Sequence, residues 1–109
     1  MKSSVEAINL SIKLLNEAIQ NVKNEKVLKF NLWMVGSELD YAALALSLFN
    51  NLIDFNPSLN SFSFNSIEEA LIKAQSLLKE ALLNIQEPKT AYEKIKQAIK
   101  LVKEVNAII

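Results

Sequence analysis

The stretch VLKFNLWMVGSELDYAALALSLFNNLIDF, residues 27–55, decides the fold that this sequence predicts. Its apolar residues recur every three or four positions, which is typical of an α-helix, and they form two adjacent seams instead of one. A helix with two seams packs against more than one neighbour, so we expect it to be the central helix of a bundle. The first seam is Leu28, Leu32, Val35, Leu39, Ala42, Leu46, Phe49 and Ile53, and the second is Phe30, Met34, Tyr41, Ala45, Leu48, Leu52 and Phe55.

The first seam supplies the predicted centre of the core, at Leu39, Leu46, Phe49 and Ile53. Only a narrow strip of the helix remains for water. This strip carries polar and small residues, and it also holds Trp33 and Leu44.

Composition excludes most kinds of chemistry. The chain has 109 residues, a length that favours one domain with a core of its own. It has no cysteine and no histidine, which removes thiol nucleophiles, catalytic triads and the usual zinc ligands. A single glycine cannot build a phosphate-binding loop or a dinucleotide fingerprint. We therefore expect no cofactor, no metal ion and no enzymatic activity.

Charge and hydropathy point to a cytoplasmic protein. Twelve basic residues, all lysine, balance twelve acidic ones, so the chain as a whole has no electrostatic footprint for nucleic acid. The N-terminal segment does not resemble a secretory signal, and no run of about eighteen apolar residues predicts a membrane span.

Three serine or threonine residues, each followed three positions later by glutamate, predict the starts of three further helices. They are Ser3 with Glu6, Ser66 with Glu69, and Thr90 with Glu93. The polar run 23–26 predicts a break between the first two helices, and one long bent helix through this point is the alternative. Asn56-Pro57 is expected to end the second helix, and Pro88 the third.

These elements predict an all-α, single-domain antiparallel four-helix bundle, composed of a hairpin at 1–55, a crossover loop at 56–65 and a hairpin at 66–109. In the crossover, Leu59, Phe62 and Phe64 are spaced so that they can pin the loop across the bundle. A shift of 63 positions also superimposes Ser3, Glu6 and Ala7 on Ser66, Glu69 and Ala70. This similarity suggests two equivalent helical hairpins, although amphipathic helices of similar composition resemble one another without a repeat.

Two polar residues of the second helix, Asn31 and Glu38, project from its apolar sector. A carboxylate buried there must be paired, hydrogen bonded or protonated. We expect Glu38 to be partly shielded and to contact a lysine, an amide or a hydroxyl group. The alternative is a ligand-binding protein or enzyme that uses the bundle interior around this pair.

The last helix carries a stripe of four lysines that could bind a nucleic-acid backbone or an acidic partner. A solvated helix face explains the same pattern, because no aromatic residue interleaves the lysines. We therefore expect no nucleic-acid binding. The four residues are Lys89, Lys96, Lys100 and Lys103.

Trp33 is the only tryptophan in the chain, and it lies on the strip of the second helix that should face water. Gly36 and Ser37 beside it are small enough to let another backbone come close, and Leu44 continues the strip. We therefore predict a subunit interface at these four residues, in a protein-interaction module that forms a homo-oligomer or binds another protein. Coverage of the strip by Phe62 and Phe64 of the same chain is the alternative.

Overall fold

The structure contains four α-helices and no strand in the residues that it describes, 2–109. It is a computed structural model. The helices are α1 (Ser4–Gln20), α2 (Glu25–Phe49), α3 (Ile67–Leu83) and α4 (Pro88–Ile108). They form a four-helix bundle, which confirms the predicted fold class.

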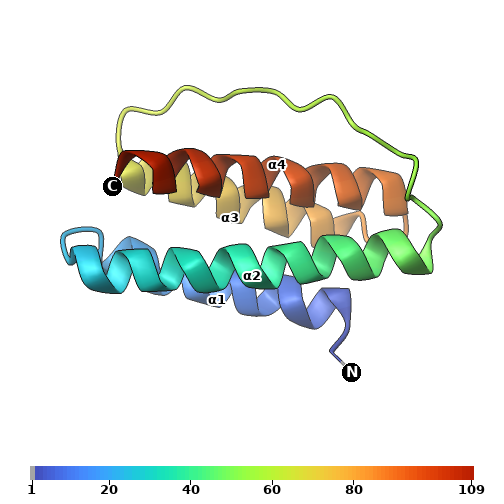
Figure 1. The fold of residues 1–109 in the computed structure, drawn as a ribbon, viewed down its shortest axis with the longest axis horizontal. Helices are drawn as coiled ribbons and strands as arrows, with labels where there is room; N and C mark the ends of the chain where they lie inside the picture. The colour runs from blue at the N-terminus through green and yellow to red at the C-terminus, as the bar shows by residue number, and fades with distance from the viewer. Residues whose placement is uncertain (1) are drawn as a thin grey trace.

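The helices are arranged in a ring in which each packs against two others. α1 lies beside α2 and α3, and α4 lies beside the same two helices. Each helix runs antiparallel to both of its neighbours (Figure 1). α2 therefore packs against two neighbours, as its two seams predict, but so does every other helix. α2 is the longest of the four helices without being more central than the rest.

Side-chain caps begin three of the helices. Ser3 and Ser66 accept hydrogen bonds from the backbone N–H groups of Glu6 and Glu69, both at 3.1 Å, as predicted. Asn24 caps α2 and separates it from α1, so the two helices are not one bent helix. This break lies at residues 21–24, slightly before the predicted position.

The predicted start of α4 is wrong. Pro88 is its first residue, and the expected cap at Thr90 lies inside the helix. A proline fits the first helical position because its missing N–H would have no helical partner there. Pro88 therefore begins α4, while α3 has already ended at Leu83.

α2 ends six residues earlier than the predicted Phe55, because Asn51 takes a left-handed conformation with φ of 55°. The backbone N–H of Leu52 then donates to the carbonyl of Ser47 at 2.9 Å. This bond and the left-handed residue form a Schellman motif, which closes the helix and folds Leu52 into the protein interior. The crossover consequently spans 50–66, not 56–65.

The core confirms part of the predicted burial. Leu39 and Leu46 are buried between the helices, but Phe49 is 81% exposed and Ile53 is 69% exposed. Phe49 is the last residue of the 25-residue α2, which is longer than the 17-residue α1 beside it. Ile53 lies beyond the helix end. Both side chains therefore extend past the neighbours that would have covered them.

The crossover runs along the bundle and is fixed to α4 by polar contacts (Figure 1). The side-chain amide of Gln97 accepts from the backbone N–H of Asn60 at 2.8 Å and donates to the carbonyl of the same residue. Lys100 Nζ donates to Ser61 Oγ at 3.0 Å. Phe62 and Phe64 pack against the core, as predicted.

Three of the four helix boundaries match between the two hairpins, and only the ends of α2 and α4 differ. A shift of 63 positions superimposes α1 on α3 at both ends and superimposes the first residue of α2 on that of α4. The turns also match: the N–H of Asn24 donates to Asn21 at 2.9 Å, and that of Glu87 to Asn84 at 2.8 Å. The similarity in sequence thus corresponds to two hairpins of the same construction.

Candidate interaction surface on α2

Four large apolar side chains lie on the outer face of α2, and we call them the α2 stripe. They are Phe30, Trp33, Leu44 and Leu48, and they are 58%, 67%, 59% and 60% exposed. At 100° per residue, all four fall within one sector of about 60°. Single exposed apolar residues are common on proteins, whereas four on one face of one helix are a concentration of exposed apolar surface, here in two pairs toward the two ends of α2.

Two of these residues, Phe30 and Leu48, were expected to be buried as part of the second seam. That seam is divided in the structure: Met34 and Tyr41 pack against the core, whereas Phe30 and Leu48 point outward. The Phe30 ring instead lies beside Trp33, with 6.3 Å between the ring centroids. Their exposure is indicated in the sequence by their angular position on the helix, which is close to that of Trp33 and Leu44.

Beside the stripe, a groove of about 360 Å³ runs between α2 and α4. Trp33, Gly36 and Ser37 form its α2 side, and Asp40 and Lys103 also line it. Three of the four predicted interface residues therefore meet at one depression. The fourth, Leu44, continues the exposed face toward the end of α2.

Gly36 has free space around it. A Cβ atom built at this position meets no atom within 4 Å. Nothing inside the described chain requires a glycine here, although glycine destabilises a helix interior by up to about 1 kcal/mol relative to alanine. The small residue consequently leaves the surface beside α2 open to solvent in the single chain.

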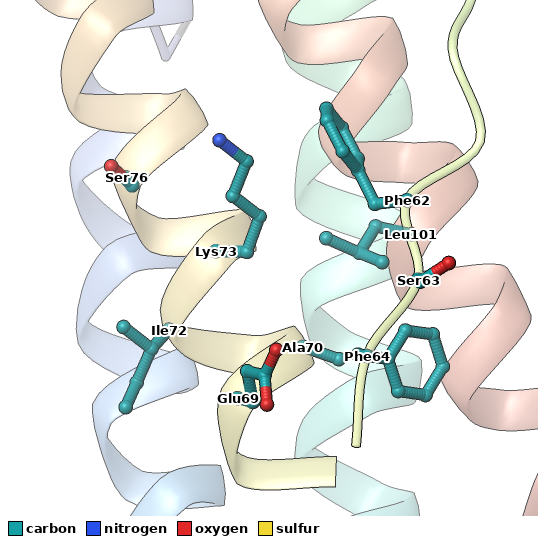
Figure 2. A pocket seen from close by; sticks show the side chains of 9 residues that line it. All are labelled: Phe62, Ser63, Phe64, Glu69, Ala70, Ile72, Lys73, Ser76 and Leu101. Carbon is teal, nitrogen blue, oxygen red and sulfur yellow. The ribbon is translucent and has the colours of Figure 1, made fainter. Parts of the chain in front are cut away.

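The alternative cover for Trp33 is excluded, because the crossover aromatics lie elsewhere. Phe62 and Phe64 line a pocket of about 370 Å³ between the crossover and α3, with Leu101 of α4 also in its wall (Figure 2). Lys73 Nζ lies 4.8 Å from the centroid of the Phe62 ring. Trp33 is not among the residues that line this pocket.

Glu38 forms an ion pair with Lys2, which precedes α1. Its side chain is 17% exposed, so it is partly shielded and contacts a lysine as expected. Tyr41 supports this arrangement, because its hydroxyl donates to the backbone carbonyl of Lys2 and its ring lies 5.6 Å from Lys2 Nζ. These contacts attach the N-terminal segment to α2.

Asn31 is buried, and its side-chain Nδ2 has no hydrogen-bond partner in the described residues. The two polar residues of α2 are thus in different environments, one paired at the surface and one enclosed. Within residues 2–109, no group of three acidic, histidine or cysteine side chains is placed to hold a metal ion.

The four lysines of α4 lie along the path of the crossover. Lys100 binds Ser61, and Lys89 Nζ lies 5.5 Å from the centroid of the Phe55 ring. Lys96 and Lys103 line a groove with Leu59. Much of the lysine stripe therefore contacts the chain itself.

α2 is also the one helix of the described part that is long and apolar enough to cross a membrane. Length and composition alone meet this criterion, and core helices of globular proteins meet it as well. In the most apolar window of α2, 44% of the residues are buried inside the bundle.

Comparisons of the chain with protein-family models, with curated proteins and with solved structures found no match.

Proposed function

We propose that this protein is a non-enzymatic helical interaction module that self-associates through the outer face of α2. The observation that carries the proposal is the α2 stripe, with each of its four side chains more than half exposed. Exposed tryptophan is the residue type most typical of binding hot spots, and Trp33 with the neighbouring Phe30 forms one end of this stripe.

The size of the stripe suits a second protein surface. Its four side chains expose roughly 500 Å² together, taking about 200 Å² for a fully exposed side chain of this size. The largest apolar patch on a typical monomer is about 300–600 Å² and is often functional. A standard interface buries about 800 Å² on each partner, so the stripe would supply the apolar part of the interface, and the small and polar residues between and around its side chains the rest.

Binding of a small ligand in the bundle interior is the second candidate. Only the unpaired Nδ2 of Asn31 favours it. Glu38, the carboxylate predicted to share this site with Asn31, is paired with Lys2. None of the described grooves and pockets includes Asn31. Self-association explains the four exposed apolar side chains of the α2 stripe, which ligand binding in the bundle interior does not explain.

Truncation of the tryptophan tests the proposal. We expect the wild-type protein to be a dimer in sedimentation equilibrium at micromolar concentration. Trp33→Ala should raise the dissociation constant of the dimer about 30-fold or more, since a hot-spot truncation costs about 2 kcal/mol. The control is Leu83→Ala, which removes a side chain that is 86% exposed but lies on α3. This control should leave the dimer unchanged.

The tryptophan also reports on its own environment. Its fluorescence should shift to longer wavelength on dilution, as the ring returns to water. A wild-type protein that remains monomeric at high micromolar concentration overturns the proposal. If that monomer instead co-sediments with anionic phospholipid vesicles and Trp33→Ala abolishes this binding, the stripe is a membrane-contact surface.

A further inference from the structure

We infer that the partner of α2 is the α2 of a second copy, packed antiparallel across a two-fold axis that passes near Leu39. This inference rests on the proposed self-association and adds its orientation and register. Three features of the α2 surface carry it: the spacing of the large side chains, the position of the small ones, and the distribution of charge.

The large side chains of the stripe are placed almost symmetrically about residue 39. Phe30 and Leu48 lie nine residues to either side, while Trp33 and Leu44 lie six and five residues away. An antiparallel copy centred there sets Phe30 against Leu48 and Trp33 against Leu44 of the other chain. Each aromatic ring thus meets a leucine, and no apolar side chain of the stripe is left without a counterpart.

The middle of the stripe is formed by small or polar residues. Gly36 and Ser37 precede the proposed axis by two or three positions, and a Cβ at Gly36 would meet nothing in its own chain. Two helices that cross at small residues approach more closely, so the larger side chains on both sides of the axis come into contact. The free space at Gly36 is explained if the partner's backbone occupies it.

Charge favours the antiparallel orientation over the parallel one. Lys26 and Lys29 lie near the start of α2, whereas its last turn has no basic residue and Asp54 follows it. Lys29 Nζ is 2.8 Å from Glu25 Oε1, and this hydrogen bond lowers the pKa of the Glu25 carboxyl below its ordinary value. A parallel pair would place Lys26 against Lys26. An antiparallel pair places it near the negative end of the partner's helix dipole, and the exposed Asp54 follows that helix end by five residues.

The α2 surface also has room for such a partner. The crossover covers the outer face of α4, where Asn60 and Ser61 bind Gln97 and Lys100. No comparable segment of residues 2–109 covers the stripe, whose side chains remain more than half exposed. A second α2 would give this helix a third antiparallel neighbour, in the same relative orientation as α1 and α4.

Cysteine cross-linking distinguishes the two orientations, and the chain has no cysteine of its own to interfere. Ser37→Cys lies close to the proposed axis and should be joined to its copy by a short thiol-to-thiol cross-linker. Lys26→Cys lies thirteen residues from the axis, so its two copies would be about 39 Å apart and should not be joined. Lys23 and Lys29 stay in place in this variant against the single acid Glu25, so residues 23–29 keep a net positive charge.

A mixture of two cysteine variants tests the contact that the antiparallel orientation predicts. Lys26→Cys combined with a size-tagged Asp54→Cys chain should give a cross-linked product of mixed size. The control is Lys79→Cys, at an exposed position on α3, which should give no dimer.

Each outcome has a separate meaning. Cross-linking of Lys26→Cys with itself and not with Asp54→Cys means a parallel pair: the orientation inferred here is then wrong, while self-association through α2 stands. Absence of every cross-link from a protein that sediments as a monomer overturns both the inference and the proposed function. Absence of cross-links on α2 from a protein that sediments as a dimer places the interface on another helix.

Discussion

At the scale of single residues, Gly36 separates the stability of the monomer from the strength of the interface. Gly36→Ala adds a methyl group that meets nothing in the same chain. We expect the free energy of unfolding of the monomer to rise by up to about 1 kcal/mol, because alanine is the better helix former. The dimer should become weaker, because the methyl group enters the partner's space.

Urea unfolding at a concentration where the protein is monomeric measures the first effect, and sedimentation equilibrium measures the second. A variant that is more stable and dimerises as well as the wild type would show that Gly36 lies outside the interface.

Leu46 and Phe49 form a matched pair for the core. Both belong to the first predicted seam of α2, but Leu46 is buried and Phe49 is 81% exposed. Leu46→Ala should lower the free energy of unfolding by about 2–5 kcal/mol, the usual cost of a cavity in a packed core. Phe49→Ala should change it by less than about 0.5 kcal/mol, as for most surface positions. Equal losses in urea unfolding would contradict the structure.

The contrast between these two residues shows the limit of prediction at this scale. Periodicity in the sequence gives the angle at which a side chain leaves the helix, and on that basis Leu39, Leu46 and Phe49 are equivalent. It does not tell how far the facing helix extends. Phe30 and Leu48 show a second limit: they lie at the edge of an apolar sector, and periodicity does not tell where around the helix the buried sector ends, so both are predicted to be buried although they face solvent.

At the scale of the helix, Asn51 determines where α2 ends. Its φ of 55° is accessible to asparagine and glycine but strained for a β-branched residue. Asn51→Val should therefore lower the free energy of unfolding by roughly 1–2 kcal/mol, the cost of a left-handed conformation. Asn51→Gly should leave it nearly unchanged. Thermal unfolding of both variants tests this, and equal melting temperatures would show that the motif does not hold the helix end.

Helix starts were easier to predict than helix ends. Ser3 and Ser66 were identified because a capping side chain acts within one turn and leaves a local pattern. The end of α2 had a weaker signal, since Asn50-Asn51 resembles other polar positions and the more obvious Asn56-Pro57 lies further along the chain. Pro88 is compatible both with the end of one helix and with the start of the next, and in the structure it begins α4.

At the scale of the whole molecule, the two halves of the bundle have similar construction but different outer faces. The shift of 63 positions that relates the hairpins places Trp33 on Lys96, Ser37 on Lys100 and Asp40 on Lys103. The α4 face is polar and is covered by the crossover. The equivalent α2 face is apolar and open. The α2 stripe, our proposed interaction surface, thus has no apolar equivalent on α4, a difference between the two halves that the sequence shows only after they are aligned.

The attachment of the crossover to α4 also has a consequence for how the chain pairs with itself. Because two copies of the chain are identical, the first hairpin (α1 and α2) of one copy could take the place of the first hairpin of another, which is domain swapping. To do so, the crossover would have to leave α4 and give up the two hydrogen bonds between Asn60 and Gln97 and the contact of Ser61 with Lys100. The connection between the hairpins already keeps them together at an effective concentration in the millimolar range. The contacts of the crossover with α4 add to the effect of this covalent connection. Both favour the closed single-chain bundle over exchange between copies.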